Sequence, residues 1–371
     1  MRVVILSKAL VVGAYHSKLK QLAIQPGLEL IAVVPPSWRD ERGELRLETT
    51  PAEGYQFIVT PLRFNGNFHL HYYPQFDRLL KQLKPDLVHI DEEPYNLATF
   101  LAQRSANAAN ARTVFFSWQN LNRTYPPPFR WFERYVLQHA AAGIVGNHDA
   151  EEVWRAKGYR GPLTIIPQVG VEPDIFKPIE RTPASPDFVI GYAGRFVEEK
   201  GVDLLLQALS GLSGEWRADL VGSGPEQPRL IEQARQLQIA DRVRFLSWLP
   251  SAQTVDYYHT LDVLVLPSRS RPNWQDHFGR VLVDALACGV PVVGSTCGEI
   301  PNVIGDAGLI FSEGDAAALR AQLQRLHDNA NLRRDLAQRG RQRVLDHFTQ
   351  AQIARRTYEV YRSVMREVWT T

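Results

Sequence analysis

Short runs of apolar residues alternate along this chain with longer stretches of helical periodicity. In the first half, the runs that fit strands are Arg2–Ser7, Leu28–Val34, Gln56–Thr60, Leu87–Ile90, Thr113–Ser117, Gly143–Val145 and Leu163–Ile166. Helical patterns lie between most of them, as in Phe76–Leu83 and Leu97–Ala109. Strands as continuously apolar as Val3–Leu6 are typical of a parallel sheet buried on both faces. The alternation predicts a doubly wound α/β domain.

A second alternation of the same kind follows. Its strand-like runs are Phe188–Tyr192, Arg217–Val221, Val243–Phe245, Val263–Leu266, Pro291–Val293 and Gly308–Phe311. Helical patterns fit between them, notably Val202–Ala208, Gln227–Gln236 and Val281–Ala287. The stretch Lys177–Asp187 holds three prolines and no periodicity, so it is the best linker candidate. We expect Rossmann-like domains at residues 1–180 and 187–349, closed by a helical pattern from Gln350 to Trp369 in residues 350–371.

Two domains of this kind that face each other make a cleft, and ligands of open α/β sheets bind outside the carboxyl ends of the strands. Composition agrees with two soluble domains: the chain has 371 residues, of which 44% are hydrophobic and 22% charged. The net charge of +2 is spread evenly, which disfavours a nucleic-acid-binding protein. Two cysteines, Cys288 and Cys297, fit no disulfide framework and indicate a reducing compartment.

The sequence contains no recognisable targeting segment and no run near the ~20 apolar residues of a spanning helix. We therefore expect a cytoplasmic protein, and a peripheral contact with the inner face of a membrane stays open. The run Tyr125–Val136 mixes aromatic and basic residues and fits such a contact, although packing of a helix against the sheet is favoured. His89, at the end of a buried strand, is interpreted as a core residue.

The loop Gly191–Gly201 follows the first strand of the second domain and carries the cations Arg195 and Lys200 close to a helix start. Glycines at a strand end let the backbone approach a ligand, and two cations near a helix N-terminus suit a diphosphate. A glycine turn with solvated charges is an equally good interpretation of this loop alone. The fingerprints of dinucleotide-binding folds and of P-loops are not found in it.

The segment Leu266–Val293 holds two acids, Asp276 and Asp284, eight residues apart around a predicted helix that starts near Phe278–Gly279. Eight helical residues rise by about 12 Å. That separation is too large for a paired acid and base, which lie about 5–5.5 Å apart in retaining glycosidases, and it suits an elongated ligand. The alternatives are a helix N-cap for Asp276 and an exposed helix acid for Asp284.

Several motifs in this order resemble the retaining family-four glycosyltransferases of GT-B fold. They are Gly194-Arg-Phe-(x)3-Lys-Gly201, Val221-Gly-Ser-Gly-Pro225, Phe245-Leu-Ser-Trp-Leu-Pro250, the acid-x7-acid segment, Ala287-Cys-Gly-Val-Pro-Val-Val293, Gly298-Glu-Ile-Pro301, Pro85-Asp-Leu-Val-His-Ile-Asp-Glu-Glu-Pro94 and Pro167–Phe176. The resemblance implies a nucleotide-diphosphate sugar as the donor, most readily a UDP- or GDP-sugar, and a glycan, lipid-linked or small-molecule acceptor. It implies no metal and no cofactor, and a last helix that crosses back onto the first domain.

The resemblance also implies roles for individual residues. Asp276, Arg195 and Lys200 are the catalytic positions, acting while the departing phosphate takes the acceptor proton in a front-face displacement. Donor-binding positions are Gly13, Arg195, Lys200, Gly222, Trp248, Asp276, Phe278, Gly279, Arg280 and Asp284. Acceptor-side or sugar-positioning positions are His16, Asp91, Gln119, Asn120 and Arg123.

The sequence departs from the family pattern at several of these positions. The family usually has Glu at both acid positions, and an Asp carboxylate reaches roughly 1.5 Å less far. Gly13 stands alone where many members have a glycine pair. Gln119 stands where a histidine is usual, and its amide positions a group but exchanges no proton near neutral pH. The alternative function is therefore a catalytically weak sugar-nucleotide-binding or scaffold protein; a phosphorylase or epimerase would need a cofactor lysine or other acids.

Overall fold

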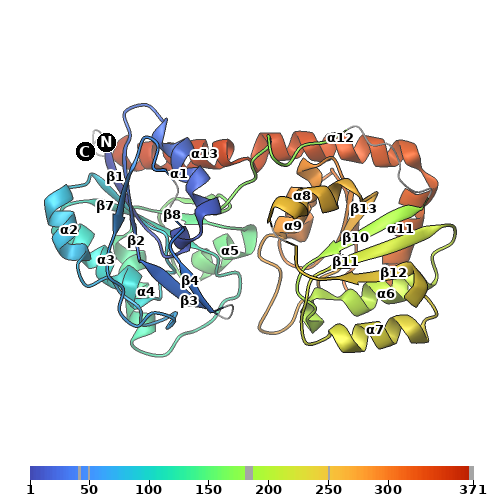
Figure 1. The fold of residues 1–371 in the computed structure, drawn as a ribbon. Coiled ribbons are helices and arrows are strands. Elements are labelled where there is room, and N and C mark those ends of the chain that lie inside the picture. The colour runs from blue at the N-terminus through green and yellow to red at the C-terminus, as the bar shows by residue number, and fades with distance from the viewer. Residues whose placement is uncertain (41–42, 49–50, 180–186, 250, 367–371) are drawn as a thin grey trace. The chain divides into compact units, whose positions relative to one another are not determined.

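The computed structural model describes residues 1–40, 43–48, 51–179, 187–249 and 251–366. These residues form two compact units. The first unit contains residues 1–170 together with the helix that begins at Gln350, and the second contains residues 171–349. Each unit is an α/β domain built on its own parallel sheet (Figure 1).

The first unit is built on a seven-stranded sheet in which every pair of neighbours is parallel. In spatial order the strands are β5 (Gln56–Val59), β2 (Glu29–Val34), β1 (Arg2–Leu6), β6 (Leu87–Ile90), β7 (Arg112–Ser117), β8 (Ala142–Val145) and β9 (Leu163–Ile165). A separate antiparallel hairpin, β3 (Ser37–Asp40) and β4 (Gly43–Arg46), follows β2. The order reverses between β1 and β6, so the switch point of this sheet lies at their carboxyl ends.

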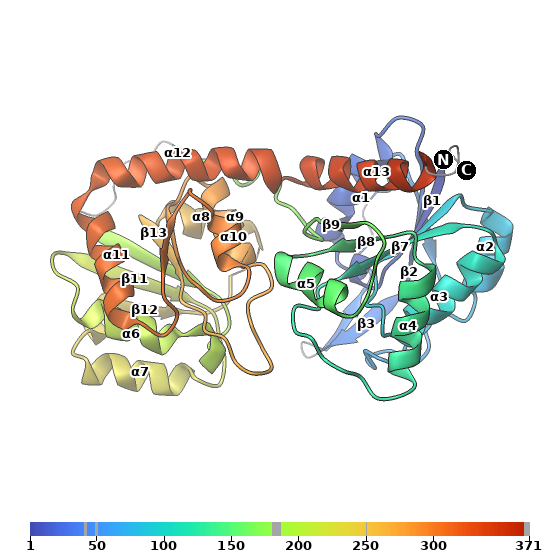
Figure 2. The same cartoon turned by 180° about the vertical axis from the view of Figure 1, so that it is seen from behind.

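Helices cover both faces of the first sheet (Figure 2). The helices of the first unit are α1 (His16–Ala23), α2 (Phe76–Leu83), α3 (Leu97–Ala108), α4 (Phe129–His139), α5 (His148–Ala156) and α13 (Gln350–Arg366). Buried side chains of α1 and α13 share one core cluster, while those of α2 and α3 share another on the opposite face. The helix α13 is therefore part of the first domain although it ends the chain.

The second unit is built on a six-stranded parallel sheet. In spatial order its strands are β12 (Val243–Leu246), β11 (Trp216–Val221), β10 (Phe188–Ala193), β13 (Val263–Leu266), β14 (Val292–Ser295) and β15 (Leu309–Phe311). Its helices are α6 (Val202–Ser210), α7 (Gln227–Gln236), α8 (Ser251–His259), α9 (Arg280–Ala287), α10 (Ile300–Ile304), α11 (Ala316–Asp328) and α12 (Ala330–His347). The order reverses between β10 and β13, which places the switch point there.

The expected α/β class with two parallel Rossmann-like sheets is confirmed. The hairpin of β3 and β4 was not expected, because its strands are short, rich in polar residues and without a continuous apolar run. The units divide at Gly170 and Val171, ahead of the expected boundary at 180. Within the second unit, the Arg341 guanidinium donates to the carbonyls of Pro173 and Phe176 and so holds this segment. Residues 180–186 of the expected linker lie outside the described residues.

Both cysteines are free and buried. Among the described residues, the helices are too short or too polar for any of them to traverse a bilayer.

Tyr361, a fully buried residue, is one of the side chains that attach α13 to the first domain. Its ring packs against His89 with centroids 5.7 Å apart, and its hydroxyl lies 2.6 Å from Nδ1 of His89. Burial lowers the pKa of His89 well below its usual value, and the positive charge of Lys18 lowers it further. His89 is therefore a neutral core group, as the sequence indicated.

Replacing Tyr361 tests this attachment. We expect Tyr361→Ala to lower the free energy of unfolding by about 3–5 kcal/mol, because it removes a buried aromatic ring. Tyr361→Phe keeps the ring but leaves Nδ1 of His89 without its partner, and should cost about 1–3 kcal/mol. Urea denaturation measures both. The exposed neighbour Arg362 is the control, and Arg362→Ala should change stability by less than about 0.5 kcal/mol. Equal losses in Tyr361→Ala and Arg362→Ala would contradict the account.

Candidate functional site

A buried ion pair joins the ends of β10 and β13 at the switch point of the second sheet. Lys200 ends a 3-10 turn after β10, and its Nζ lies 2.6 Å from Oδ2 of Asp276 in the loop after β13. Exposed fractions are 18% for the Lys200 side chain and 6% for that of Asp276. The Lys200 ammonium also lies 4.9 Å from the ring centre of Trp274. The two residues are 76 positions apart in sequence, so the sheet topology brings them together.

Asp276 is held by three donors at once. Its Oδ2 also accepts the Ser268 hydroxyl at 2.9 Å, and its Oδ1 accepts the Gly279 N–H at 3.1 Å. Burial acts to raise the pKa of Asp276, but the charge of Lys200 and these hydrogen bonds outweigh it, so the pKa lies below its usual value. Asp276 is therefore a carboxylate that stays ionised and is a weak proton acceptor.

The second acid, Asp284, is buried in the body of its helix, as expected, so the exposed-acid alternative is wrong. The helix α9 begins at Arg280 and its N-cap is Gly279, in the left-handed conformation with φ of 68°. Asp276 precedes the helix, so the expected rise of about 12 Å along one axis does not apply and the N-cap alternative is also wrong. Asp284 is buried on α9, and its Oδ1 accepts Nε of Arg280 at 2.8 Å. Burial raises the pKa of Asp284, against the charge of Arg280.

Glycines bring the loops after β10 and β11 into contact. A Cβ on Gly222 would lie 1.8 Å from the carbonyl oxygen of Gly194, and one on Gly224 would lie 2.2 Å from that of Phe196. The Phe196 N–H donates to the carbonyl of Ser223 at 2.8 Å. These glycines are therefore required by the packing of the two loops themselves, whether or not a ligand approaches them.

Of the remaining donor-side candidates, all but Gly13 lie at the same edge of the second sheet or beside it. Arg195 is exposed on the loop after β10, and Trp248, after β12, has an exposed fraction of 65%. Phe278 is half-buried against Phe348, with ring centroids 5.7 Å apart. Gly13 belongs to the first unit, where its N–H donates to Oε2 of Glu48 at 2.7 Å.

The first unit has a matching ion pair at its own switch point. Lys8 follows β1, and its ammonium pairs with Oε2 of Glu92, which follows β6. Next to it, the Ser7 hydroxyl donates to Oδ2 of Asp91 at 2.7 Å. The Lys8 ammonium also lies 5.3 Å from the ring centre of Trp38 and 4.9 Å from that of Phe68. In both units, therefore, a lysine after the first strand meets a carboxylate across the switch point.

Glu92 is the most strongly held carboxylate of the first unit. Its Oε1 accepts the Lys8 N–H and the Tyr73 hydroxyl, each at 3.1 Å, and Nε2 of His71 lies 3.4 Å from Oε2. Burial acts to raise the pKa of Glu92, but the charges of Lys8 and His71 outweigh it and lower the pKa to about 2. Glu92 therefore remains ionised at every physiological pH.

The acceptor-side candidates lie in the first unit in differing environments. Asp91 is buried and its Oδ1 accepts Nε2 of Gln168 at 2.9 Å. His16 is buried with its Nε2 2.7 Å from the Leu10 carbonyl. Gln119 and Asn120 are buried in the loop after β7, and Arg123 is exposed further along it. The role of these residues toward a ligand stays a prediction.

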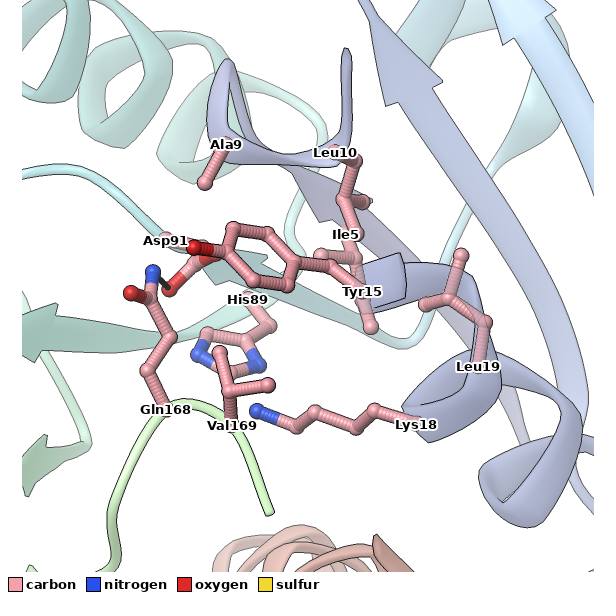
Figure 3. A pocket seen from close by; sticks show the side chains of 10 residues that line it. All are labelled: Ile5, Ala9, Leu10, Tyr15, Lys18, Leu19, His89, Asp91, Gln168 and Val169. Carbon is pink, nitrogen blue, oxygen red and sulfur yellow. Dashed lines mark hydrogen bonds between the residues drawn. The ribbon is translucent and has the colours of Figure 1, made fainter. Parts of the chain in front are cut away.

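A pocket opens beside Asp91 in the first unit (Figure 3). Half of its lining side chains are apolar, and the polar half are Tyr15, Lys18, His89, Asp91 and Gln168. Figure 3 shows the Gln168 amide against Asp91 and the Lys18 ammonium pointing toward the ring of His89. Burial lowers the pKa of Lys18, while the charge of Asp91 acts to raise it.

Sequence reasoning did not select Lys8, Lys18, Glu92 or Glu93. Lys8, Glu92 and Glu93 lie in the loops just after β1 or β6, and that position was the available signal. Lys18 carries no comparable signal, because a lysine in an amphipathic helix is normally exposed. Within the described part of the chain, no group of three His, Cys, Asp or Glu side chains is placed to hold a metal ion.

Two family models match the chain. The one described as "Glycosyl transferases group 1" matches residues 176–343, and the "Glycosyl transferase 4-like domain" matches residues 19–168. A relative from Bacillus anthracis, N-acetyl-alpha-D-glucosaminyl L-malate synthase, is 31% identical over 183 residues, covering 48% of this chain and 46% of that protein. A D-inositol 3-phosphate glycosyltransferase from Streptomyces bingchenggensis is 29% identical over 267 residues, which cover 66% of this chain and 57% of that protein. The chain spans about half the length of the curated relatives it matches.

Solved structures match over nearly the whole chain. The sucrose-phosphate synthase of Thermosynechococcus elongatus superposes with a TM-score of 0.72 at 19% identity. The match covers 99% of this chain and 100% of that chain. Anabaena HepE in complex with UDP gives a TM-score of 0.73 at 17% identity, and the match covers 98% of this chain and 100% of that chain. At these identities the similarity shows the fold.

The acid stability of the first unit tests the Glu92 ion pair. A carboxyl whose pKa falls on folding stabilises the folded state above its unfolded pKa, here 4.5, and loses that contribution as the pH falls toward about 2. Glu92→Gln should cost about 3–5 kcal/mol at pH 7, because it leaves Lys8 unpaired, and should flatten the pH dependence between 4.5 and 2. Urea midpoints at pH 7, 5 and 2.5 measure this. Glu53→Gln, at an exposed site, is the control. If the urea midpoint of Glu92→Gln changes with pH as steeply as that of the wild type, the Glu92 ion pair does not stabilise the first unit as described.

Proposed function

We propose that this chain is a group 1 glycosyltransferase of GT-B fold, family four, and that it moves a sugar from a nucleotide-diphosphate sugar to an acceptor with retention of configuration. The observation that carries the proposal is the buried pair of Lys200 and Asp276 at the switch point of the second sheet. Open α/β sheets bind their ligands at that place.

The second unit supplies the donor site in this proposal. Arg195 and Lys200 follow β10 and would neutralise the diphosphate as it leaves, which is where charge develops during transfer. The helix α6 begins one residue after Gly201, and the N-terminus of a helix favours an anion. Asp284 would hold ribose hydroxyls. Anabaena HepE, a protein of the same fold, has been crystallised in complex with UDP and with UDP-glucose, which is in keeping with a nucleotide-diphosphate sugar as the donor.

The electrostatics of Asp276 restrict its chemical role. Because its pKa lies below the usual value, it would accept hydrogen bonds from sugar hydroxyls and orient Lys200 rather than remove a proton from the acceptor. The departing phosphate oxygen would take that proton in a front-face displacement. The proposal needs no metal, since the two cations carry the leaving-group charge.

The acceptor class in this proposal is a glycan, a lipid-linked sugar or a small molecule, bound by polar groups of the first unit. Asp91, Gln119 and Asn120 follow β6 and β7 and are buried, so their polar atoms have fixed directions. Arg123 is exposed on the same loop as Gln119 and would approach an anionic acceptor.

We place the protein in the cytoplasm, where its two free cysteines would stay reduced. A peripheral membrane contact is proposed through α4. On this helix Trp131 has an exposed fraction of 65% and lies between the exposed Arg130 and Arg134. An exposed tryptophan flanked by arginines suits an anionic lipid surface.

A catalytically weak sugar-nucleotide-binding protein is the second candidate. It is favoured by the acid-x7-acid segment, in which both acids are Asp where the family usually has Glu. The Asp276 side chain is shorter than that of Glu and is bonded to Lys200. Asp276→Glu separates the candidates. Nucleotide binding without measurable transfer in both forms, across a panel of UDP-, GDP- and ADP-sugars, would favour the binding protein.

The two cations test the donor site directly. We expect Arg195→Ala and Lys200→Ala each to lower kcat/KM by about 100-fold or more, because each removes charge stabilisation of the leaving diphosphate. The thermal shift given by UDP should shrink in both. Arg235→Ala, on the exposed face of α7, is the matched control and should behave as wild type. Near-normal turnover in either site variant would overturn the donor assignment.

Cosedimentation with vesicles tests the membrane contact. The protein should bind vesicles that contain anionic lipid, and the double variant Arg130→Glu/Arg134→Glu should bind at least about tenfold less, since each cation contributes about 1 kcal/mol at such a surface. Arg355→Glu, on the exposed side of α13, serves as the charge control. If the double variant and the control bind equally, α4 is not the contact.

A further inference from the structure

A continuous hydrogen-bonded network crosses the carboxyl edge of the first sheet. From the end of β1 it runs from the Ser7 hydroxyl to Asp91 and on to Gln168. The Trp118 indole N–H then donates to Oε1 of Gln168 at 3.1 Å, while the backbone N–H of Trp118 donates to Oε1 of Glu93 at 2.7 Å. Residues from β1, β6, β7 and the segment after β9 are thereby linked by polar side chains.

Glu93 holds the loop after β7 in this network. Its Oε2 accepts the Ser117 hydroxyl at 2.6 Å, and its Oε1 accepts the Trp118 N–H. The Ser117 oxygen in turn accepts the Gln119 N–H at 3.0 Å. One carboxylate thus fixes three successive residues of the loop that carries the acceptor-side candidates.

The side chain of Gln119 has an unpaired hydrogen-bond acceptor among the described residues. The side chain is buried, and its Nε2 donates to the Leu121 carbonyl at 3.2 Å. Its Oε1 is buried and has no hydrogen-bond partner among the described residues. A buried amide oxygen left unpaired costs about 1–3 kcal/mol, so a hydroxyl group that bonds to it would be bound in part by relief of that cost.

The charge of Glu93 decides how the Ser117 hydroxyl points. A carboxylate accepts only, so Ser117 must donate to it and keeps its lone pairs for the Gln119 N–H. When Glu93 is protonated, its own O–H can donate to the Ser117 oxygen and then competes with the Gln119 N–H for that oxygen. The position of Gln119 therefore depends on the ionisation of a group that it does not touch.

Resting on the proposed function, we propose that Glu93 is a positioning residue: its carboxylate holds the loop Ser117–Gln119 so that Oε1 of Gln119 accepts a hydroxyl of the transferred sugar or of the acceptor. Glu93 itself touches neither. The ligand group is an uncharged hydroxyl, since the free group of Gln119 is a neutral amide oxygen, which accepts a hydrogen bond and carries no charge.

Several charged or titratable groups surround Glu93. Burial raises the pKa of Glu93 to about 7; the bonds from Ser117 and Trp118 and the charge of Lys8 act to lower it, and the charge of Glu92 acts to raise it. Tyr95 and Tyr125 also face it, and burial together with Glu93 raises the pKa of each, so both stay neutral. Among the carboxyl and phenol groups here, Glu93 is thus the one that changes charge near neutral pH.

Tryptophan-selective 15N NMR tests the positioning without any turnover. The chain has 8 Trp residues, and Trp118→Phe identifies the two Trp118 resonances. In the wild type, the Trp118 backbone resonance should move with a single midpoint near pH 7, and in Glu93→Gln it should not move between pH 6 and 8. Glu53→Gln, at an exposed site, should leave the titration unchanged. No movement in the wild type, or equal movement in Glu93→Gln, would overturn the proposal.

The pH dependence of transfer supplies the second readout. For one group with a midpoint near pH 7, kcat/KM should rise about tenfold from pH 6 to pH 8 in the wild type and stay flat in Glu93→Gln. Gln119→Leu should lower kcat/KM about 10- to 100-fold at every pH, and Gln119→Glu, which keeps an acceptor oxygen, should recover part of it. A wild-type pH profile in Glu93→Gln would contradict the proposal. Failure of all forms to transfer any sugar would instead count against the proposed function, which the NMR titration does not use.

Discussion

The polar architecture of this protein depends on one constraint, the burial of a carboxylate beside a lysine where each sheet reverses its strand order. In a doubly wound sheet the two strands at the switch point are adjacent, and their loops turn to opposite faces, which leaves polar backbone and side chains between them. Lys8 with Glu92 in the first unit and Lys200 with Asp276 in the second occupy this place. A charge buried there has to be paired, so the pairs fix the loops that carry the other candidate residues.

Neighbouring carboxylates differ in charge behaviour because their partners differ. Glu92 meets Lys8 and His71, and its pKa falls to about 2. Glu93, the next residue, is bonded to the neutral groups of Ser117 and Trp118, and burial raises its pKa to about 7. One therefore serves as a permanent counter-charge, while the other changes state near neutral pH. In the second unit, Asp276 and Asp284 differ for the same reason, since three donors hold Asp276 and burial dominates at Asp284.

The sequence predicted the strands of both sheets because their apolar runs are continuous. It did not predict the β3–β4 hairpin, whose strands have no such pattern. The predicted helix start near Phe278–Gly279 agrees with α9, which begins at Arg280 after its N-cap Gly279. Spacing along the chain gave only a separation of Asp276 and Asp284 along one helix axis, whereas the partner that fixes Asp276 is 76 residues away. Such a partner follows from topology, which a linear pattern does not contain. The resemblance to family four selected Lys200 and Asp276 separately, and the structure shows that they are bonded to each other.

The most direct test of the account is a crystal structure of this chain in complex with UDP. The account predicts the diphosphate at the carboxyl ends of β10 and β13, with its oxygens within hydrogen-bond distance of Lys200 and Arg195 and the ribose hydroxyls at Asp284. A diphosphate bound elsewhere on the second unit, with Lys200 still bonded to Asp276 and distant from the phosphates, would contradict it.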